Sequence, residues 1–254
     1  MGKELDDGEY GALRMYEEFI AEYHQLLEGL EAHRVTKDVG AECFAWDSIE
    51  GQLLLKGDSV IELGGGNLPA VSGVLYYVGL EPAGNAAKRV TLYGSDLPML
   101  KGDVPYARVS LVGVRKEFTT EEYKLYNLLR SIEYIRYHVN PRGYMPRIST
   151  VQGREQVRVS KDALDSGLDF YKAGRLYEEA YLKHPAVQSV ETVFITLQDF
   201  DYRAMQKVFD RAESVTMSLD HPLNNLKMDC NSCNLKPVCD EVDALCGDLL
   251  LSDK

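Results

Sequence analysis

Near the start of the chain, apolar residues recur at steps of three and four, and glutamates occupy the positions between them. The apolar positions are Leu13, Tyr16, Ile20, Tyr23, Leu27 and Leu30. A stripe with this period is typical of one amphipathic helix whose apolar side packs in a core. We therefore assign residues 1–50 to an N-terminal helical segment.

From Gln52 onward the pattern changes to short runs rich in β-branched residues, separated by clusters of glycine and proline. The runs that we predict as strands are 59–63, 74–78, 89–93 and 107–114. The glycines at 64–66 are followed by Pro69 and another such run, so they indicate a tight turn rather than a phosphate-binding loop, which needs a helix directly after it. Because no helical pattern separates these runs, we expect neighbouring strands to pair antiparallel.

Helical patterns dominate the second half of the chain. We predict one helix from Thr119 or Thr120 to about 140, a short helix capped by Ser160, and another over 174–183. A basic loop over 142–158 precedes the short helix, and an apolar strand is expected over 190–197. A last helix, capped by Asp199 or Asp201, should bury four apolar side chains. Those four are Met205, Val208, Phe209 and Ala212.

This order predicts an α+β fold, with a mostly antiparallel sheet and packed helices. We divide the chain into the N-terminal helical segment (1–50), an α+β domain (51–218) and a C-terminal cysteine-rich metal-binding tail (219–254).

Four of the five cysteines lie close together near the end of the chain, at Cys230, Cys233, Cys239 and Cys246. Their spacing is C-x2-C-x5-C-x6-C. Four thiolates on so short a segment are suited to holding one metal centre, either a [4Fe-4S] cluster or a zinc ion. In the zinc case His221 could replace one sulfur, and spacing alone does not choose between the two metals.

The chain is acidic, with 28 Lys and Arg against 40 Asp and Glu and a net charge of -12. Such a surface repels phosphate backbones and anionic lipid, so we expect neither nucleic acid nor a membrane as partner. No stretch reaches the ~18 apolar residues that a membrane-spanning helix needs, and the acidic start does not have the pattern of a signal peptide. We therefore expect a cytoplasmic protein, where clustered thiols bind metal more often than they form disulfides.

Several short stretches carry a family resemblance when they are taken together and in order. KGDSVIELGGGNLPA at 56–70 is followed by YGSD at 93–96, RVSKDA at 158–163, VFIT at 193–196 and the cysteine segment ending in Cys246 and Gly247. This series resembles the middle domain of acetyl-CoA synthase, the nickel-containing partner of carbon monoxide dehydrogenase, together with the start of its A-cluster region. The resemblance covers roughly residues 56–248 and does not include the N-terminal helix.

The resemblance implies a [4Fe-4S] cluster on Cys230, Cys233, Cys239 and Cys246, with Cys233 matching the thiolate that bridges to nickel. It also implies carbon monoxide dehydrogenase or a corrinoid iron–sulfur protein as partners. The gaps after Cys233 and Cys239 are shorter than in the family, and the sequence contains no Cys-Gly-Cys, which holds the family's second nickel. We therefore do not expect this chain alone to catalyse the CO-methylating acetyl-CoA synthase reaction.

The leading hypothesis is an iron–sulfur protein that serves acetyl-CoA or one-carbon metabolism as an accessory, electron-transfer or abbreviated component. The alternative is a zinc-stapled protein-binding module without redox chemistry.

Four arginines, Arg142, Arg147, Arg154 and Arg158, stand close together in an otherwise acidic sequence. The family's middle domain binds coenzyme A with basic and aromatic residues, so these arginines are candidates for its phosphates; surface salt bridges explain them about as well. The only tryptophan, Trp46, lies outside the matched stretch, so the sequence offers no counterpart to an adenine-stacking ring. Cys43 has apolar neighbours and is interpreted as a packed thiol rather than a fifth ligand.

Overall fold

Two β-sheets and the helices around them make up the computed structural model, which describes residues 11–38, 46–78, 88–119, 122–148 and 154–219, together with Pro237. The helices are α1 (Gly11–Leu27), α2 (Glu122–Tyr134), α3 (Lys161–Asp165), α4 (Phe170–Leu182) and α5 (Tyr202–Ser218). The strands are β1 (Arg34–Asp38), β2 (Ser59–Leu63), β3 (Ala70–Val78), β4 (Lys88–Tyr93), β5 (Tyr106–Val114), β6 (Tyr144–Ile148), β7 (Glu155–Ser160) and β8 (Val187–Ile195).

The larger sheet has five strands in the order β1-β4-β8-β5-β3, and the smaller one has three in the order β2-β7-β6. The predicted α+β class is confirmed. The smaller sheet is antiparallel, but the larger one is mixed, because β3 pairs with β5 and β4 pairs with β8 in parallel. The expectation that successive strands pair antiparallel is wrong for β2 to β5, none of which is hydrogen-bonded to its neighbour in the sequence.

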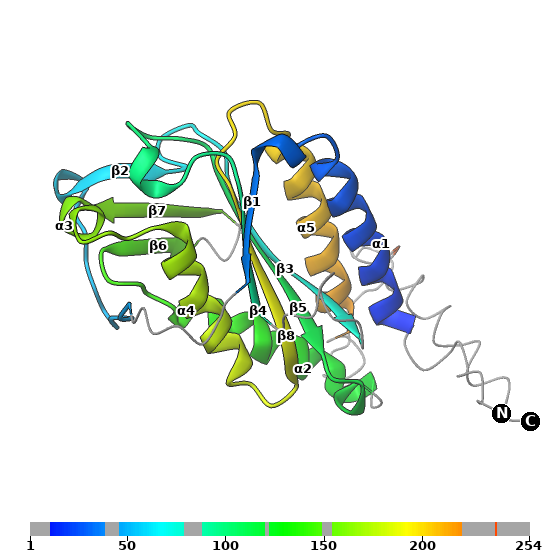
Figure 1. The fold of residues 1–254 in the computed structure, drawn as a ribbon. Helices are drawn as coiled ribbons and strands as arrows, with labels where there is room; N and C mark the ends of the chain where they lie inside the picture. Colours follow the sequence, from blue (N-terminus) through cyan, green and yellow to red (C-terminus); the bar gives the residue numbers. More distant parts are fainter. Residues whose placement is uncertain are drawn as a thin grey trace, which may run out of the picture.

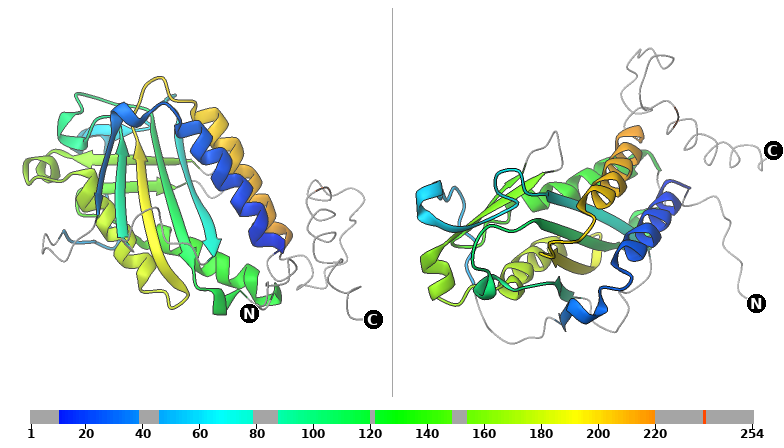
Figure 2. Two further views of the ribbon diagram at one scale, coloured as in Figure 1. Left: turned by 45° about the vertical axis from the view of Figure 1, so that its right-hand side comes forward. Right: turned by 90° about the horizontal axis from the view of Figure 1, so that it is seen from above.

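Helices on both sides of the larger sheet explain this pairing. Figures 1 and 2 show α1 and α5 side by side over one face, with α2 and α4 on the other. Every residue of β5 is buried as a result. Strands buried on both faces are typical of sheets with parallel pairs, whereas the expectation of antiparallel pairing rested only on the absence of helical patterns between the runs.

Helix α5 lies directly against the backbone of β3 at Gly73. A Cβ atom at this position would come within 2.2 Å of the ring of Phe209, so only glycine allows the helix and the strand to approach this closely. The four apolar residues predicted to be buried on this helix are all in the core, and Asp201 caps it by accepting a hydrogen bond from the Ala204 amide at 2.9 Å.

The N-terminal segment contributes to the same core as the rest of the chain. Its predicted helix is confirmed as α1, whose Tyr16, Phe19 and Tyr23 are buried. The strand β1 was not predicted, and it pairs with β4 at the edge of the larger sheet. The division of the chain at residue 50 stays a prediction.

The predicted basic loop is instead a β-hairpin formed by β6 and β7. Side chains alternate across a strand, so Val157 and Val159 face the core while Arg158 lies on the outer side. The density of arginines hid this alternation in the sequence. The short helix after the hairpin is confirmed as α3, with Ser160 as its cap.

A buried ion pair joins the two sheets. Arg108 on β5 donates from Nε and Nη2 to both carboxylate oxygens of Glu155 on β7, at 2.9 and 2.6 Å, and both side chains are fully buried. The third guanidinium nitrogen donates to Ser110 at 3.2 Å, and the ring of Tyr177 lies 4.0 Å from the guanidinium carbon. Every polar atom of Arg108 thus has a partner inside the core.

We predict that Arg108→Met lowers the free energy of unfolding by about 3–5 kcal/mol, because it leaves the Glu155 carboxylate buried and unpaired. The double variant R108M/E155L removes both charges and should recover much of this loss. Urea unfolding followed by circular dichroism measures both effects. A single variant as stable as the wild type would show that the pair does not hold the sheets together.

A buried carboxyl group lies between α4 and the larger sheet. Glu178 is fully buried, and neither of its carboxylate oxygens has a hydrogen-bond partner within 3.5 Å in the described part of the chain. Burial raises the pKa of Glu178 to about 9 from 4.5, although Lys88 favours the charged form. The folded protein therefore retains a proton that the unfolded chain releases above pH 4.5.

Stability should fall as the pH rises from 4.5 toward 9, by at most about 1.4 kcal/mol per pH unit. Glu178→Gln carries no titrating group, so its stability advantage over the wild type should grow from pH 5 to pH 8. Thermal or urea unfolding at several pH values measures this difference in stability between the variant and the wild type. Glu179→Gln, at the neighbouring and more exposed position, is the matched control and should leave the pH dependence as it is.

Candidate functional site

The predicted metal ligands Cys230, Cys233, Cys239 and Cys246 lie outside the described residues, as do Cys43 and His221. Within the described ranges, no group of three or more His, Cys, Asp or Glu side chains is arranged to hold a metal ion. The metal site therefore stays a prediction from the sequence. The described ranges offer no other metal-binding group as an alternative to it.

Two of the four candidate arginines hold the smaller sheet together. Arg154 donates from Nη2 to the carbonyls of Gly64, Gly66 and Leu68, at 3.2, 2.7 and 3.3 Å. Arg158 donates to Glu62 at 2.7 Å and to the carbonyl of Leu54 at 2.9 Å. Arg154 thus fixes the turn that follows β2, which the sequence correctly predicted and which has Gly64 and Gly66 at positive φ.

The other two arginines lie apart from each other. Arg147 is exposed on β6, opposite Gln156 of β7 and on the same outer face as Arg158. Arg142 precedes β6 and forms an exposed ion pair with Asp47 at 3.0 Å. Three of the arginines therefore share one face of the smaller sheet, while Arg142 belongs to a different surface.

The structure brings the single tryptophan to Arg142, which the sequence did not reveal. The indole of Trp46 donates to the carbonyl of Arg142 at 3.0 Å, and the ammonium of Lys172 lies 5.5 Å from the ring centroid. Trp46 and Arg142 border a groove of about 870 Å³. Because Asp47, Asp58 and Asp162 also line it, opposed by Arg142 and Lys161, the groove has no excess of positive charge for a polyphosphate.

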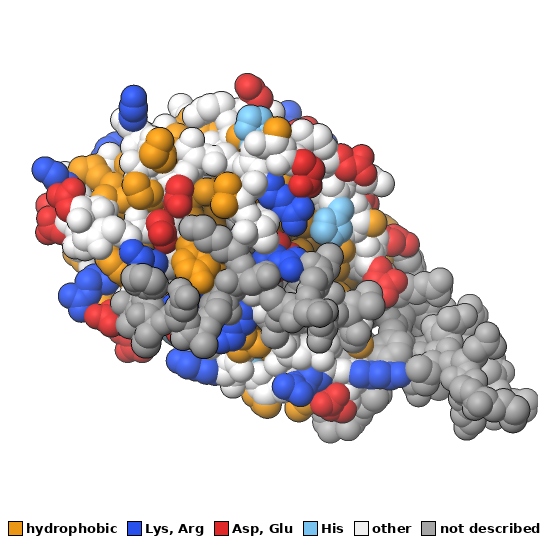
Figure 3. Space-filling view, in the orientation of Figure 1, with side chains coloured by type: hydrophobic (Ala, Val, Ile, Leu, Met, Phe, Trp, Pro, Cys, Tyr) orange, Lys and Arg blue, Asp and Glu red, His pale blue; other side chains and the backbone are white. Residues whose placement is uncertain are grey.

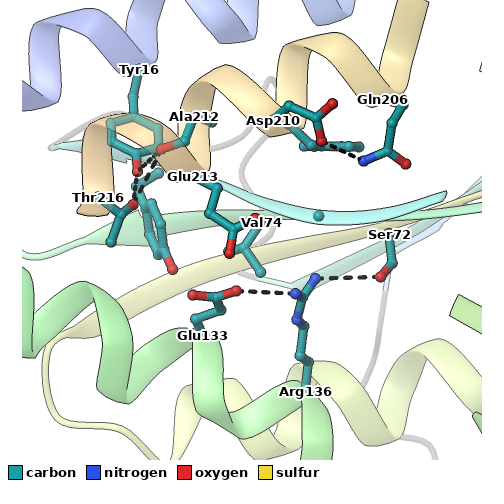
Figure 4. A pocket seen from close by; sticks show the side chains of 13 residues that line it. Tyr16, Ser72, Val74, Glu133, Arg136, Gln206, Asp210, Ala212, Glu213 and Thr216 are labelled. Atoms are coloured by element: carbon teal, nitrogen blue, oxygen red, sulfur yellow. Dashed lines mark hydrogen bonds and ion pairs between the residues drawn. The ribbon is translucent and has the colours of Figure 1, made fainter. Parts of the chain in front are cut away.

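A small polar cavity at the edge of β3 lies between α5 and the end of α2 (Figure 4). In it, Arg136 donates to Glu133 at 3.0 Å and to Ser72 at 3.4 Å, and Tyr16 donates to the carbonyl of Ala212 at 3.0 Å. Burial, reinforced by the charge of Glu133, raises the pKa of Glu213. The cavity has a volume of only about 30 Å³, enough for one or two waters and too small for a substrate.

A larger groove lies between α1 and the larger sheet. Its volume is about 680 Å³, and it is lined by tyrosines, leucines and several charged side chains. The sequence reasoning missed it because α1 was interpreted only as a core helix. Its signal in the sequence is the row of polar residues inside two buried strands, at Arg89, Thr91 and Glu191.

On the face shown in Figure 3, acidic and basic side chains are interspersed. Within the described ranges, no helix combines the length and the apolar character needed to cross a bilayer.

The fold and these surfaces define an α+β protein with a mixed five-stranded sheet and a smaller antiparallel one. No protein-family model matches the chain, and a search of curated proteins found no match either.

The arginines of the smaller sheet can be told apart by their effects on stability. Arg154→Met removes the donor shared by three carbonyls and should lower the free energy of unfolding by about 1–3 kcal/mol. Arg147→Met, on the same face but exposed, should change it by less than about 0.5 kcal/mol. Thermal melts of both variants provide the measurement, and equal effects would contradict a structural role for Arg154.

Proposed function

We propose that this chain is an iron–sulfur protein whose [4Fe-4S] cluster is bound by Cys230, Cys233, Cys239 and Cys246. The observation that carries the proposal is the C-x2-C-x5-C-x6-C spacing, which gathers four thiolates within 17 residues, C-terminal to α5 in the sequence. The alternative is a zinc ion on the same thiolates, as a staple for a protein-binding module.

A cluster held by one short segment needs no ligand from the described body, whose hydrophobic core is formed by side chains between Met15 and Leu219. We therefore expect this body to fold before or without the metal.

The resemblance to acetyl-CoA synthase suggests where such a protein acts. We propose an accessory or electron-transfer component of one-carbon and acetyl-CoA metabolism, in a reducing compartment, which docks to carbon monoxide dehydrogenase or to a corrinoid iron–sulfur protein. A nickel at Cys233 is the family's chemistry, but the Cys-Gly-Cys site that completes it is absent from the sequence.

Only two of the four candidate arginines stay in the proposal as ligands for the phosphates of coenzyme A. The four candidates were Arg142, Arg147, Arg154 and Arg158. Arg154 and Arg158 already donate to protein acceptors, so Arg142 and Arg147 are the two with exposed guanidinium groups. The nearby ring of Trp46 gives the Arg142 surface the aromatic partner that the sequence did not suggest.

The test of the cluster is metal analysis of protein purified without exposure to air. We expect a brown protein with about four irons and four sulfides per chain. Cys233→Ser should lose most of this iron while the circular dichroism of the body is unchanged.

Cys43→Ser is the matched control, because it removes the one cysteine outside the segment and should keep the full iron content. A colourless protein with one zinc per chain would contradict the iron–sulfur cluster and support the zinc-stapled binding module instead. Iron lost equally from both variants would contradict the assignment of the ligands.

A further inference from the structure

The groove between α1 and the larger sheet has a floor that combines aromatic rings with unused polar groups. Tyr23 and Tyr93 line it with exposed fractions of only 1% and 4%. Neither hydroxyl makes a hydrogen bond within the described part of the chain. Neither hydroxyl oxygen is among the buried polar atoms without a partner, so both are open to the groove, where a ligand can reach them.

An acidic side chain lines the same groove as the two phenols. Glu191 on β8 accepts a hydrogen bond from the hydroxyl of Thr91 at 2.6 Å, and Arg89 lies opposite it in the register of β4 and β8. Tyr23, Tyr93 and Glu191 line the same groove, and the charges of Glu191 and Tyr93 both act on Tyr23. Burial raises the pKa of Tyr23 well above 10, so its phenol keeps its proton.

The remaining charges of the groove leave it acidic. Arg34 at the rim is paired with Glu31 at 3.1 Å. Glu17 and Glu28 add two further exposed carboxylates from α1, while Arg89 is the second basic residue of the lining. Four carboxylates therefore face two guanidinium groups and His24, which disfavours an anionic ligand and attracts a cationic one.

The rest of the lining is apolar. Ile20, Leu27, Leu111 and the ring of Tyr77 surround the polar centre. A volume of about 680 Å³ is in the range of small-molecule sites. The groove thus matches a molecule with a charged end and an apolar body, rather than an ion alone.

We propose that this groove binds a small amphipathic primary amine, with its ammonium group at Glu191, Tyr23 and Tyr93. A primary ammonium has three N–H donors and no acceptor. It can donate to the free oxygen of Glu191 and to the two phenol oxygens, while the tyrosine rings contribute cation–π attraction. The apolar body then lies against Ile20, Leu27 and Leu111.

The test compares three probes with the same body and different end groups: 4-phenylbutylamine, 4-phenylbutan-1-ol and 4-phenylbutanoate. Isothermal titration calorimetry on the full chain should show binding of the amine, about tenfold or more weaker binding of the alcohol, and no binding of the acid. This comparison uses the wild-type protein and does not depend on the folding of any variant.

Glu191→Gln keeps the acceptor for Thr91 and should weaken amine binding about tenfold or more, with no change for the alcohol. Glu117→Gln removes one exposed carboxylate outside the groove and is the control for net charge. Equal binding of amine and alcohol, stronger binding of the acid, equal effects of the two variants, or no binding of any probe at millimolar concentration would each overturn the proposal.

Discussion

The ion pair between Arg108 and Glu155 is the interaction on which the arrangement of the two sheets depends. It is fully buried, it is the only charged link described between β5 and β7, and all three guanidinium nitrogens have acceptors. The hydrogen bond between the hydroxyls of Tyr106 and Tyr144, at 2.6 Å, lies in the same interface. A shift of one strand against the other would leave both buried charges without a partner, which is strongly destabilising. The apolar contacts around the ion pair bury surface. The ion pair and its hydrogen bonds define how the two sheets are placed against each other.

The elements with strong local signals could be predicted from the sequence. Strand 59–63 was predicted with the bounds that β2 has, and Ser160 and Asp201 cap the helices expected of them. These features depend on a few neighbouring residues, whose chemistry is visible in the sequence. Strand β1 was missed because its sequence, RVTKD, is short and polar, and it is stabilised by pairing with β4 rather than by its own pattern.

Features that depend on distant residues could not be predicted in this way. Glu155 and Arg108 are 47 positions apart, and nothing local marks either as buried. Arg154 and Arg158 looked like ligands for phosphate, but Arg154 donates to the turn after β2, and Arg158 donates to Glu62 and to the carbonyl of Leu54. Trp46 reaches Arg142 across 96 positions. The candidate metal site is the opposite case, since its four cysteines are adjacent in sequence and need no fold to bring them near.

The strand order has a consequence for how the chain is made. β8 is the last strand of the larger sheet to be synthesised, yet it lies in the middle, between β4 and β5. Until residue 195 has left the ribosome, only two separate halves can form, β1 with β4 and β3 with β5. Each half exposes an unpaired edge of buried, apolar strand during this interval. The insertion of this late strand joins the two halves. A nascent chain that stalls before β8 is synthesised is therefore prone to aggregation.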